Sequence, residues 1–278
     1  MAIWGKKATT DDRNPTLVAG LELYDAGDFA GAIPPLLERV RDSDAFAAFK
    51  LANALFEIDQ PRAAIAFWEL AILWGNKDSY NNLANRYKDE KFLGKAYELY
   101  VLGAENGSDD AMHSAGVVAL DLGKEDEGIA WLQKGMTEGN LRCYAVLGKH
   151  LFDSGQQERA LEVLEAGVSK SSLSCLLQMG LIFHNKEEYP QALEVLLKAL
   201  EIEEIDAREK HLEVFVHGLL AAIYSTQGEF ENAVKHAEIA SKLGSKDADT
   251  LLESLRPALE AASQGFATPM KEIFGKTR

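Results

Sequence analysis

The sequence predicts an all-α protein, a right-handed α-solenoid of about seven antiparallel helix pairs. Three observations support this prediction. Small residues recur every 32 residues in two parallel columns, and large apolar residues follow each column at helical spacing. Glycine and proline stand where the expected helices end and begin.

The two columns of small residues define the repeat. The first column advances by 32 residues until its last step, which is 41, and consists of Gly20, Ala52, Ala84, Gly116, Gly148, Gly180 and Ala221. The second column lies twelve residues further on and consists of Ala32, Ala64, Ala96, Gly128, Ala160, Ala192 and Ala233. Helices approach closely only where one of them presents a small side chain, so each unit should place one such residue on each helix at the crossing.

Large apolar residues complete the two helix faces of each unit. Leu, Phe, Tyr or Trp stands in most units three residues after the first column and four residues after the second. This is the i, i+3, i+4 spacing of a helix face turned to a core. The pattern therefore predicts core packing and gives no sign of a cofactor pocket.

The turns carry their own signals. Three glycines recur at the repeat spacing, each followed by a residue that can cap the next helix, in the pairs Gly75-Asn76, Gly107-Ser108 and Gly139-Asn140. Pro61 and Pro190 fall where a second helix should begin, a position where the missing N–H costs nothing. The pair Pro34-Pro35 is predicted to shorten or kink the second helix of the first unit.

The chain is expected to fall into four segments. These are an N-terminal extension at 1–14, the repeat solenoid at 15–249, a capping helix at 250–264 interrupted near Pro257, and a flexible tail at 265–278. The longer step before Ala221 places nine extra residues in a charged stretch at 201–214. Because this stretch lacks Gly and Pro, it predicts a lengthened helix pair in solvent, which is either a solvated extension or a contact arm for a partner.

Charge and cysteine content narrow the class of protein. The net charge of −15 disfavours nucleic acid and anionic membranes and favours a neutral or basic partner. No stretch approaches the roughly 20 apolar residues that a membrane span needs, so a cytoplasmic protein is expected. Cys143 and Cys175 are one repeat apart, too far for a disulfide, and are predicted to be buried apolar residues in a reducing compartment.

The sequence lacks several common catalytic and metal-binding motifs. The sequence contains no H-E-x-x-H, no C-x-x-C and no G-x-S-x-G, and its six histidines lack ligand spacing. The carboxylates are numerous but fit exposed helix faces. No cofactor, no metal and no enzymatic activity are therefore predicted.

Three segments with small, aromatic and small residues at fixed spacing, GLELYDAGDFAGAI, ANRYKDEKFLGKAYELY and AAIYSTQGEFENAVKHAEIA, resemble the tetratricopeptide repeat. The segments AENGSDDAMHSAG and TEGNLRCYAVLG are similar to the related Sel1-like repeat. The resemblance covers residues 15–249, although 32 residues is short for a tetratricopeptide unit and that family's frequent proline after the second helix is missing. It implies a scaffold, adaptor or peptide receptor.

Three hypotheses for the function follow from these features. The favoured one is an interaction scaffold or adaptor that binds a peptide or a helix of a partner protein in its concave groove. The second is a regulatory peptide receptor, or a chaperone or carrier of a secreted protein, that uses the same groove. The third is an enzyme with a site between repeats. The identity of the partner and the oligomeric state stay open.

The resemblance also implies which residues face a ligand, since the first helix of each tetratricopeptide unit lines the groove. The groove-facing positions correspond to Lys50, Asn53, Asn82 and Asn85, with Asn81 and His113 one turn away and Arg142 and Lys149 as anion contacts on a later first helix. Asn53 and Asn82 match asparagines that grip a terminal carboxylate in some family members. The basic residues of that clamp are replaced by Phe49, Asp110 and Ser114. Because an amide both donates and accepts, the asparagines suit an extended peptide backbone.

Overall fold

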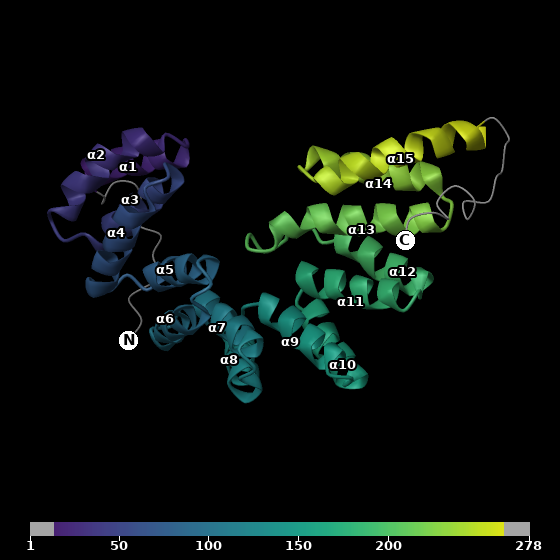
Figure 1. Cartoon of the computed structure of the whole chain (residues 1–278), viewed down its shortest axis with the longest axis horizontal. Helices are drawn as coiled ribbons and strands as arrows, with labels where there is room; N and C mark the ends of the chain where they lie inside the picture. Colours follow the sequence, from purple (N-terminus) through teal and green to yellow (C-terminus); the bar gives the residue numbers. More distant parts are fainter. Residues whose placement is uncertain (1–13, 264–278) are drawn as a thin grey trace. The chain divides into compact units, whose positions relative to one another are not determined.

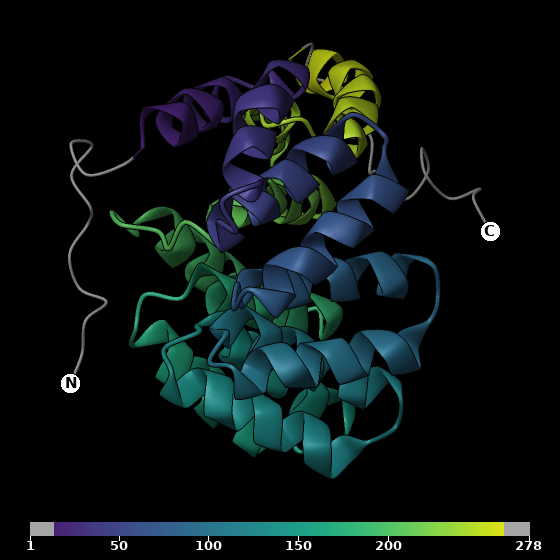
Figure 2. The ribbon, with the colours of Figure 1, turned by 90° about the vertical axis from the view of Figure 1, so that its left-hand side faces the viewer.

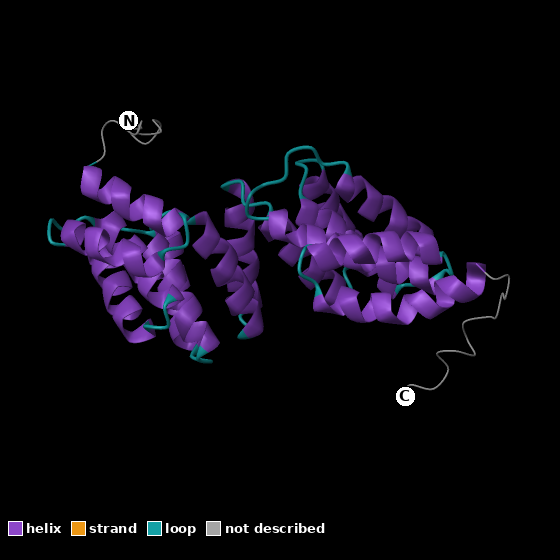
Figure 3. Ribbon diagram, turned by 90° about the horizontal axis from the view of Figure 1, so that it is seen from above, coloured by secondary structure: helices purple, strands orange, loops and turns teal. Residues whose placement is uncertain are grey.

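The structure is a computed structural model that describes residues 14–263 (Figure 1). Over this range the chain forms α-helices joined by short turns, with one 3-10 helix and no strand (Figure 3). The all-α prediction is therefore confirmed. Apart from Asn14, the N-cap of the first helix, the extension expected at 1–14 lies outside the described residues, as does the tail expected at 265–278.

The chain divides after Asn140 into two compact units. The first holds four helix pairs, α1 (Pro15–Asp25) with α2 (Phe29–Val40), α3 (Ala45–Glu57) with α4 (Pro61–Leu73), α5 (Asp78–Asp89) with α6 (Leu93–Glu105), and α7 (Asp109–Asp121) with α8 (Glu125–Thr137). The second holds α9 (Arg142–Asp153) with α10 (Gln157–Val168), α11 (Leu173–Asn185) with α12 (Tyr189–Leu200), η1 (Lys210–Leu212), α13 (Glu213–Thr226) with α14 (Phe230–Lys242), and α15 (Lys246–Ser263).

The two helices of each pair pack directly on one another (Figure 2). The small residues lie where they cross. All fourteen column positions are buried. A methyl group added at Gly148 would lie 2.5 Å from Leu164 Cγ on the second helix of the pair, and one at Gly180 would lie 2.6 Å from Leu196 Cδ2. Such distances are far below van der Waals contact, so these crossings require glycine.

The residue sixteen positions after the first column varies with the size of that column's residue. Where the column has glycine, a leucine covers it, as in the pairs Gly20–Leu36, Gly116–Leu132, Gly148–Leu164 and Gly180–Leu196. Where the column has alanine, the residue sixteen positions later is Trp68, Tyr100 or Ala237. A flat ring, or the small side chain of Ala237, leaves room for a methyl group that a branched leucine excludes, so the two positions are matched in shape.

All but one of the turns between successive α-helices of the described chain contain a residue with positive φ. Gly75, Gly107 and Gly139 have φ values of 91°, 82° and 88°, as their spacing predicts. Gly75 N–H donates to Ile72 O at 2.9 Å and Asn76 N–H to Ala71 O at 2.8 Å, the two bonds of a Schellman motif. The exception is the turn that contains the charged 201–214 stretch.

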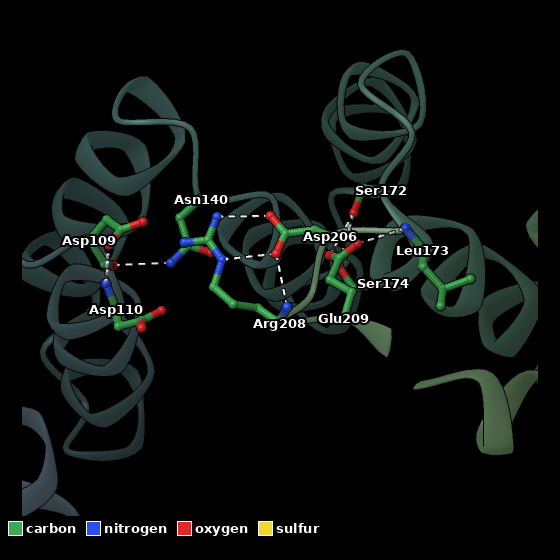
Figure 4. A network of polar contacts seen from close by, with 9 residues as sticks. All are labelled: Asp109, Asp110, Asn140, Ser172, Leu173, Ser174, Asp206, Arg208 and Glu209. Atoms are coloured by element: carbon green, nitrogen blue, oxygen red, sulfur yellow. Dashed lines mark hydrogen bonds and ion pairs between the residues drawn. The ribbon is translucent and has the colours of Figure 1, made fainter. Parts of the chain in front are cut away.

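The residues after these glycines have different partners. The side chain of Asn76 accepts from Ser79 N–H at 2.9 Å and that of Ser108 from Ala111 N–H at 3.3 Å, so both caps are confirmed. Asn140 Nδ2 donates to Asp109 O, at the start of α7, at 3.1 Å (Figure 4). The residue after the turn glycine thus caps the next helix in two turns and contacts the preceding first helix in the third.

The predicted lengthened helix pair at 201–214 is wrong. Helix α12 ends at Leu200 and α13 begins at Glu213, and the intervening residues form turns and η1. Glu209 is only 1% exposed. Its carboxylate accepts from Ser172 Oγ at 3.0 Å, Leu173 N–H at 2.8 Å and Ser174 Oγ at 2.5 Å (Figure 4). Donors at the N-terminus of α11 attract the carboxylate and fold the stretch inward.

The prolines do not interrupt their helices, so the predicted shortening at Pro34-Pro35 and the predicted interruption near Pro257 are also wrong, whereas the alternative of a kink at Pro34-Pro35 stays a prediction. Helix α2 contains Pro34 and Pro35 yet runs for 12 residues, and α15 begins at Lys246 and continues through Pro257. Each proline removes one backbone hydrogen bond, whereas a helix in a protein is stabilised mainly by packing of its apolar face. In α2 that face buries Ala32, Leu36 and Val40.

Both cysteines are buried in the second unit, as predicted. Burial raises the pKa of the Cys175 thiol to about 12, so it stays protonated at neutral pH and lacks the thiolate that redox chemistry requires. Within residues 14–263, no helix combines the length and the apolar character needed to cross a membrane.

Candidate functional site

Asn53 of α3 and Asn82 of α5 are joined by a side-chain hydrogen bond in the first unit. Asn82 Nδ2 donates to Asn53 Oδ1 at 2.8 Å, and Trp68 Nε1 of α4 donates to the same oxygen at 2.8 Å. Both asparagines are half-buried. Asn53 is therefore a junction between its own helix pair and the next one.

The indole of Trp68 fixes the orientation of both amides. An indole N–H only donates, so Asn53 must present its oxygen to it. The same oxygen accepts from Asn82, which turns the Asn82 amino group inward. Asn82 Oδ1 has no donor among the described residues, so it is an open acceptor on this surface.

Asn85 repeats the arrangement one unit later. Its Oδ1 accepts from Tyr100 Oη at 2.5 Å, and Tyr100 stands fifteen residues after Asn85, as Trp68 does after Asn53. Burial, with a smaller effect from Asp89, raises the pKa of Tyr100, so its hydroxyl stays protonated and can donate. The described chain provides no partner for Asn85 Nδ2, which leaves a donor one helical turn from the acceptor of Asn82.

The other predicted residues of the first unit lie on neighbouring first helices. Asn81 Oδ1 accepts from Ser114 Oγ at 3.2 Å and so joins α5 to α7, where His113 is half-buried. Lys50 lies on α3 with its Nζ 4.5 Å from the centroid of the Tyr24 ring. The structure therefore joins Asn53 to Asn82 directly, with Lys50 one turn before Asn53 and Asn85 one turn after Asn82. Asn81 and His113 lie towards α7.

Arg142 and Lys149 lie on α9, in the second unit. Lys149 forms an ion pair with Asp153, and Arg142 is close enough to Asp206 to lower its pKa, after the larger effect of Arg208. Their role as anion contacts in the groove of Asn53 stays a prediction.

A pocket of about 260 Å³ lies over the asparagines and connects α1, α3, α4 and α5. It is lined by Tyr24, Asn53, Phe56, Glu57, Trp68, Asn82, Asn85, Arg86 and Asp89. The rings of Phe56 and Trp68 lie 5.6 Å apart, and Phe56 is 40% exposed. The pocket thus has an aromatic wall, amide groups and charged residues at its edge.

Sequence reasoning found the asparagines of this pocket but missed its aromatic and charged lining. Trp68 belongs to a column assigned only to the core, although its indole N–H is a hydrogen-bond donor. Phe56 and Glu57 follow Asn53 by three and four residues, so helical spacing places them on the same face and could have indicated them. Tyr24 comes from another repeat, and no local pattern connects it to Asn53.

The described residues offer little for a metal or cofactor. They contain no group of three or more His, Cys, Asp or Glu side chains that could hold a metal ion. His217 and His236 pair through their Nδ1 atoms at 2.9 Å between α13 and α14. Burial lowers both pKa values, that of His236 to about 4 with a further contribution from His217, so the pair is neutral and suits packing.

Comparison with known proteins agrees with this architecture. Residues 173–206 match the tetratricopeptide repeat family model. A search of curated proteins gave no significant match. Among solved structures, a tetratricopeptide repeat protein from Parabacteroides merdae has a TM-score of 0.62 at 14% identity, over 87% of this chain and 97% of its own.

Sel1-like proteins have the same fold. A Sel1 repeat protein from Oxalobacter formigenes has a TM-score of 0.59 at 18% identity, over 81% of this chain and 99% of its own. The c5321 antigen of uropathogenic Escherichia coli, with an SLR fold, has a TM-score of 0.56 at 17% identity, over 95% of this chain and 64% of its own. The described chain thus has the helical-repeat fold of tetratricopeptide and Sel1-like proteins, and one of its repeats matches the tetratricopeptide family model. Repeats of this type generally mediate protein–protein interaction and are typically not enzymes.

Proposed function

We propose that the protein is an interaction module whose first unit binds an extended peptide of a partner protein across α1, α3 and α5. The single observation that carries the proposal is the pocket at Asn53, Asn82 and Asn85, where an open acceptor and an open donor lie one turn apart beside an aromatic wall. A peptide backbone offers a donor and an acceptor at each residue, so it complements this pair.

The packing within the first unit supports the choice of face. Two neighbouring pairs of first helices contact each other, α1 with α3 and α5 with α7. Helices α3 and α5, between which the pocket lies, do not make comparable contact, and neither do any two of the second helices α2, α4, α6 and α8. The more closely spaced layer of a stacked-pair unit lies on its inner side. The asparagine pocket opens on this layer, where a bound segment can touch several repeats.

A random-heptapeptide display library panned against the full chain tests the proposal. Selected peptides are then measured in solution by fluorescence anisotropy against the unmodified protein and the Asn82→Ala variant. Asn82 is the best position because replacing Asn53 or Asn85 would also leave Trp68 or Tyr100 without an acceptor. Loss of one or two hydrogen bonds predicts about threefold to tenfold weaker binding.

A matched control is Asn232→Ala, because Asn232 is an exposed residue of a second helix and bonds only to the nearby Glu229. It should leave the affinity unchanged. Equal affinities for the unmodified protein, Asn82→Ala and Asn232→Ala, with all three folded by circular dichroism, would mean that the selected peptides bind elsewhere.

A further inference from the structure

The pocket above the asparagines has more aromatic surface than backbone binding requires. Tyr24, Phe56 and Trp68 come from three different helices and line one hollow. At about 260 Å³ it is smaller than the roughly 300–1,000 Å³ typical of pockets for drug-sized ligands. Its volume therefore suits one large side chain of a bound peptide better than a separate small molecule.

The charges at the edge of the pocket are mainly negative. Glu57 and Asp89 line it, and neither forms an ion pair with a described residue. The one cation in the lining, Arg86, pairs with Glu90 at 2.7 Å. Lys50 is held over Tyr24 rather than in the lining itself.

These carboxylates belong to a column with the period of the repeat. The first helices of the first unit all end in an acidic residue, and these residues are 32 apart: Asp25, Glu57, Asp89 and Asp121. A carboxylate at the C-terminus of a helix lies beside the negative end of the helix dipole, which is locally unfavourable. Helix ends and carboxylates together make this side of the pocket negative.

The electrostatic effect reaches the pocket wall. Burial is the largest cause of the raised pKa of Tyr24, and the carboxylates of Glu57 and Asp25 raise it further against a hydrogen bond with Asn53. The Tyr24 ring already holds one cation, because Lys50 Nζ lies 4.5 Å from its centroid. A group that is positive, carries only donors and has an apolar stem would match the rings, the open oxygen of Asn82 and the carboxylates together.

We propose that this pocket receives the cationic side chain of an arginine or lysine in the bound peptide. The proposal rests on the proposed function and names the class of residue that the peptide must contain. The guanidinium or ammonium group lies between Glu57 and Asp89 and donates to Asn82 Oδ1, while the stem packs on Phe56 and Tyr24.

The same heptapeptide library provides the probe. The selected peptides should share an arginine or lysine at one position. Each is resynthesised with citrulline in place of arginine or norleucine in place of lysine, so that the charge is lost but most of the shape is kept. The neutral peptide should bind at least tenfold more weakly.

A charge-neutral version of the protein gives the reciprocal test. The double variant Glu57→Gln with Asp89→Asn should weaken the charged peptide about threefold to tenfold and leave the neutral peptide unaffected. The control double variant Glu69→Gln with Glu98→Gln removes the same charge from exposed positions on α4 and α6, and should bind like the unmodified protein.

The outcomes separate the two proposals. Peptides that depend on Asn82 but bind equally with citrulline or norleucine would overturn the cationic pocket and leave the peptide-binding proposal standing. Equal binding of the charged peptide to both double variants would also overturn the cationic pocket. A library that yields no peptide sensitive to Asn82→Ala would overturn both proposals.

Discussion

Replacing Gly148 by alanine tests the packing of helix pairs at one atom. The added methyl group would lie 2.5 Å from Leu164 Cγ and 2.6 Å from its Cδ2, about 1 Å closer than contact allows. Leu164 is fully buried and cannot move into solvent. Overpacking costs about 1–3 kcal/mol, and the better helix propensity of alanine returns up to about 1 kcal/mol. The expected net loss is about 1–2 kcal/mol.

Gly218 provides the matched control. It lies inside α13 of the same unit, and a methyl group there would meet nothing within 4 Å. Gly218→Ala should therefore stabilise the protein by about 0.5–1 kcal/mol. Thermal unfolding followed by circular dichroism should show a melting temperature lower by about 2–8 °C for Gly148→Ala and slightly higher for Gly218→Ala. If both variants shift in the same direction by the same amount, the account of the small columns is wrong.

Three further predictions concern polar groups. Glu209→Gln should cost about 1–3 kcal/mol, because it weakens three hydrogen bonds to the start of α11, and hydrogen exchange should rise in residues 201–212. His236 has a folded pKa of about 4, below its unfolded value near 6.5, so its stabilising effect is complete above pH 6.5 and is lost as the pH falls towards 4. Urea unfolding of His236→Gln should show a decline over that range that is shallower by on the order of 2 kcal/mol, while exposed His211→Gln should keep the full decline. Asn53→Ala should cost about 1–3 kcal/mol by removing the acceptor of the Trp68 indole, and adding Trp68→Phe should recover part of that loss in a double-mutant cycle.

Most of the fold could be predicted because close helix packing restricts the residue type at single positions of the sequence. A methyl group added at such a glycine would lie as close as 2.5 Å to a leucine, so a larger residue there is unfavourable and the glycines in the sequence mark where helix pairs cross. The turns at Gly75, Gly107 and Gly139 were predictable for a different reason, because their φ values near +90° favour glycine.

The errors came from residues whose surroundings are distant in sequence. Glu209 looks like one of many solvated carboxylates, yet its partners lie 35–37 residues earlier, at the start of α11. Pro34, Pro35 and Pro257 break helices by local rules, but packing of the apolar face decides whether the helix continues.

The candidate site was predictable in part. The resemblance to tetratricopeptide repeats indicated Asn53 and Asn82, but the direction of their amides follows from Trp68, fifteen residues after Asn53. The pocket itself joins side chains from several repeats. A pattern with a period of 32 describes each repeat singly, and the volume enclosed between repeats requires their placement in space.

Mapping a selected peptide onto the protein by NMR tests the central claim most directly. Backbone amide shifts of the full chain would be recorded with and without saturating peptide, together with the indole N–H of Trp68, assigned with a Trp68→Phe variant. The account predicts that the largest changes fall on α1, α3 and α5 and on the Trp68 indole. Changes concentrated on the second helices α2, α4 and α6, or around Glu204 in the second unit, would contradict it.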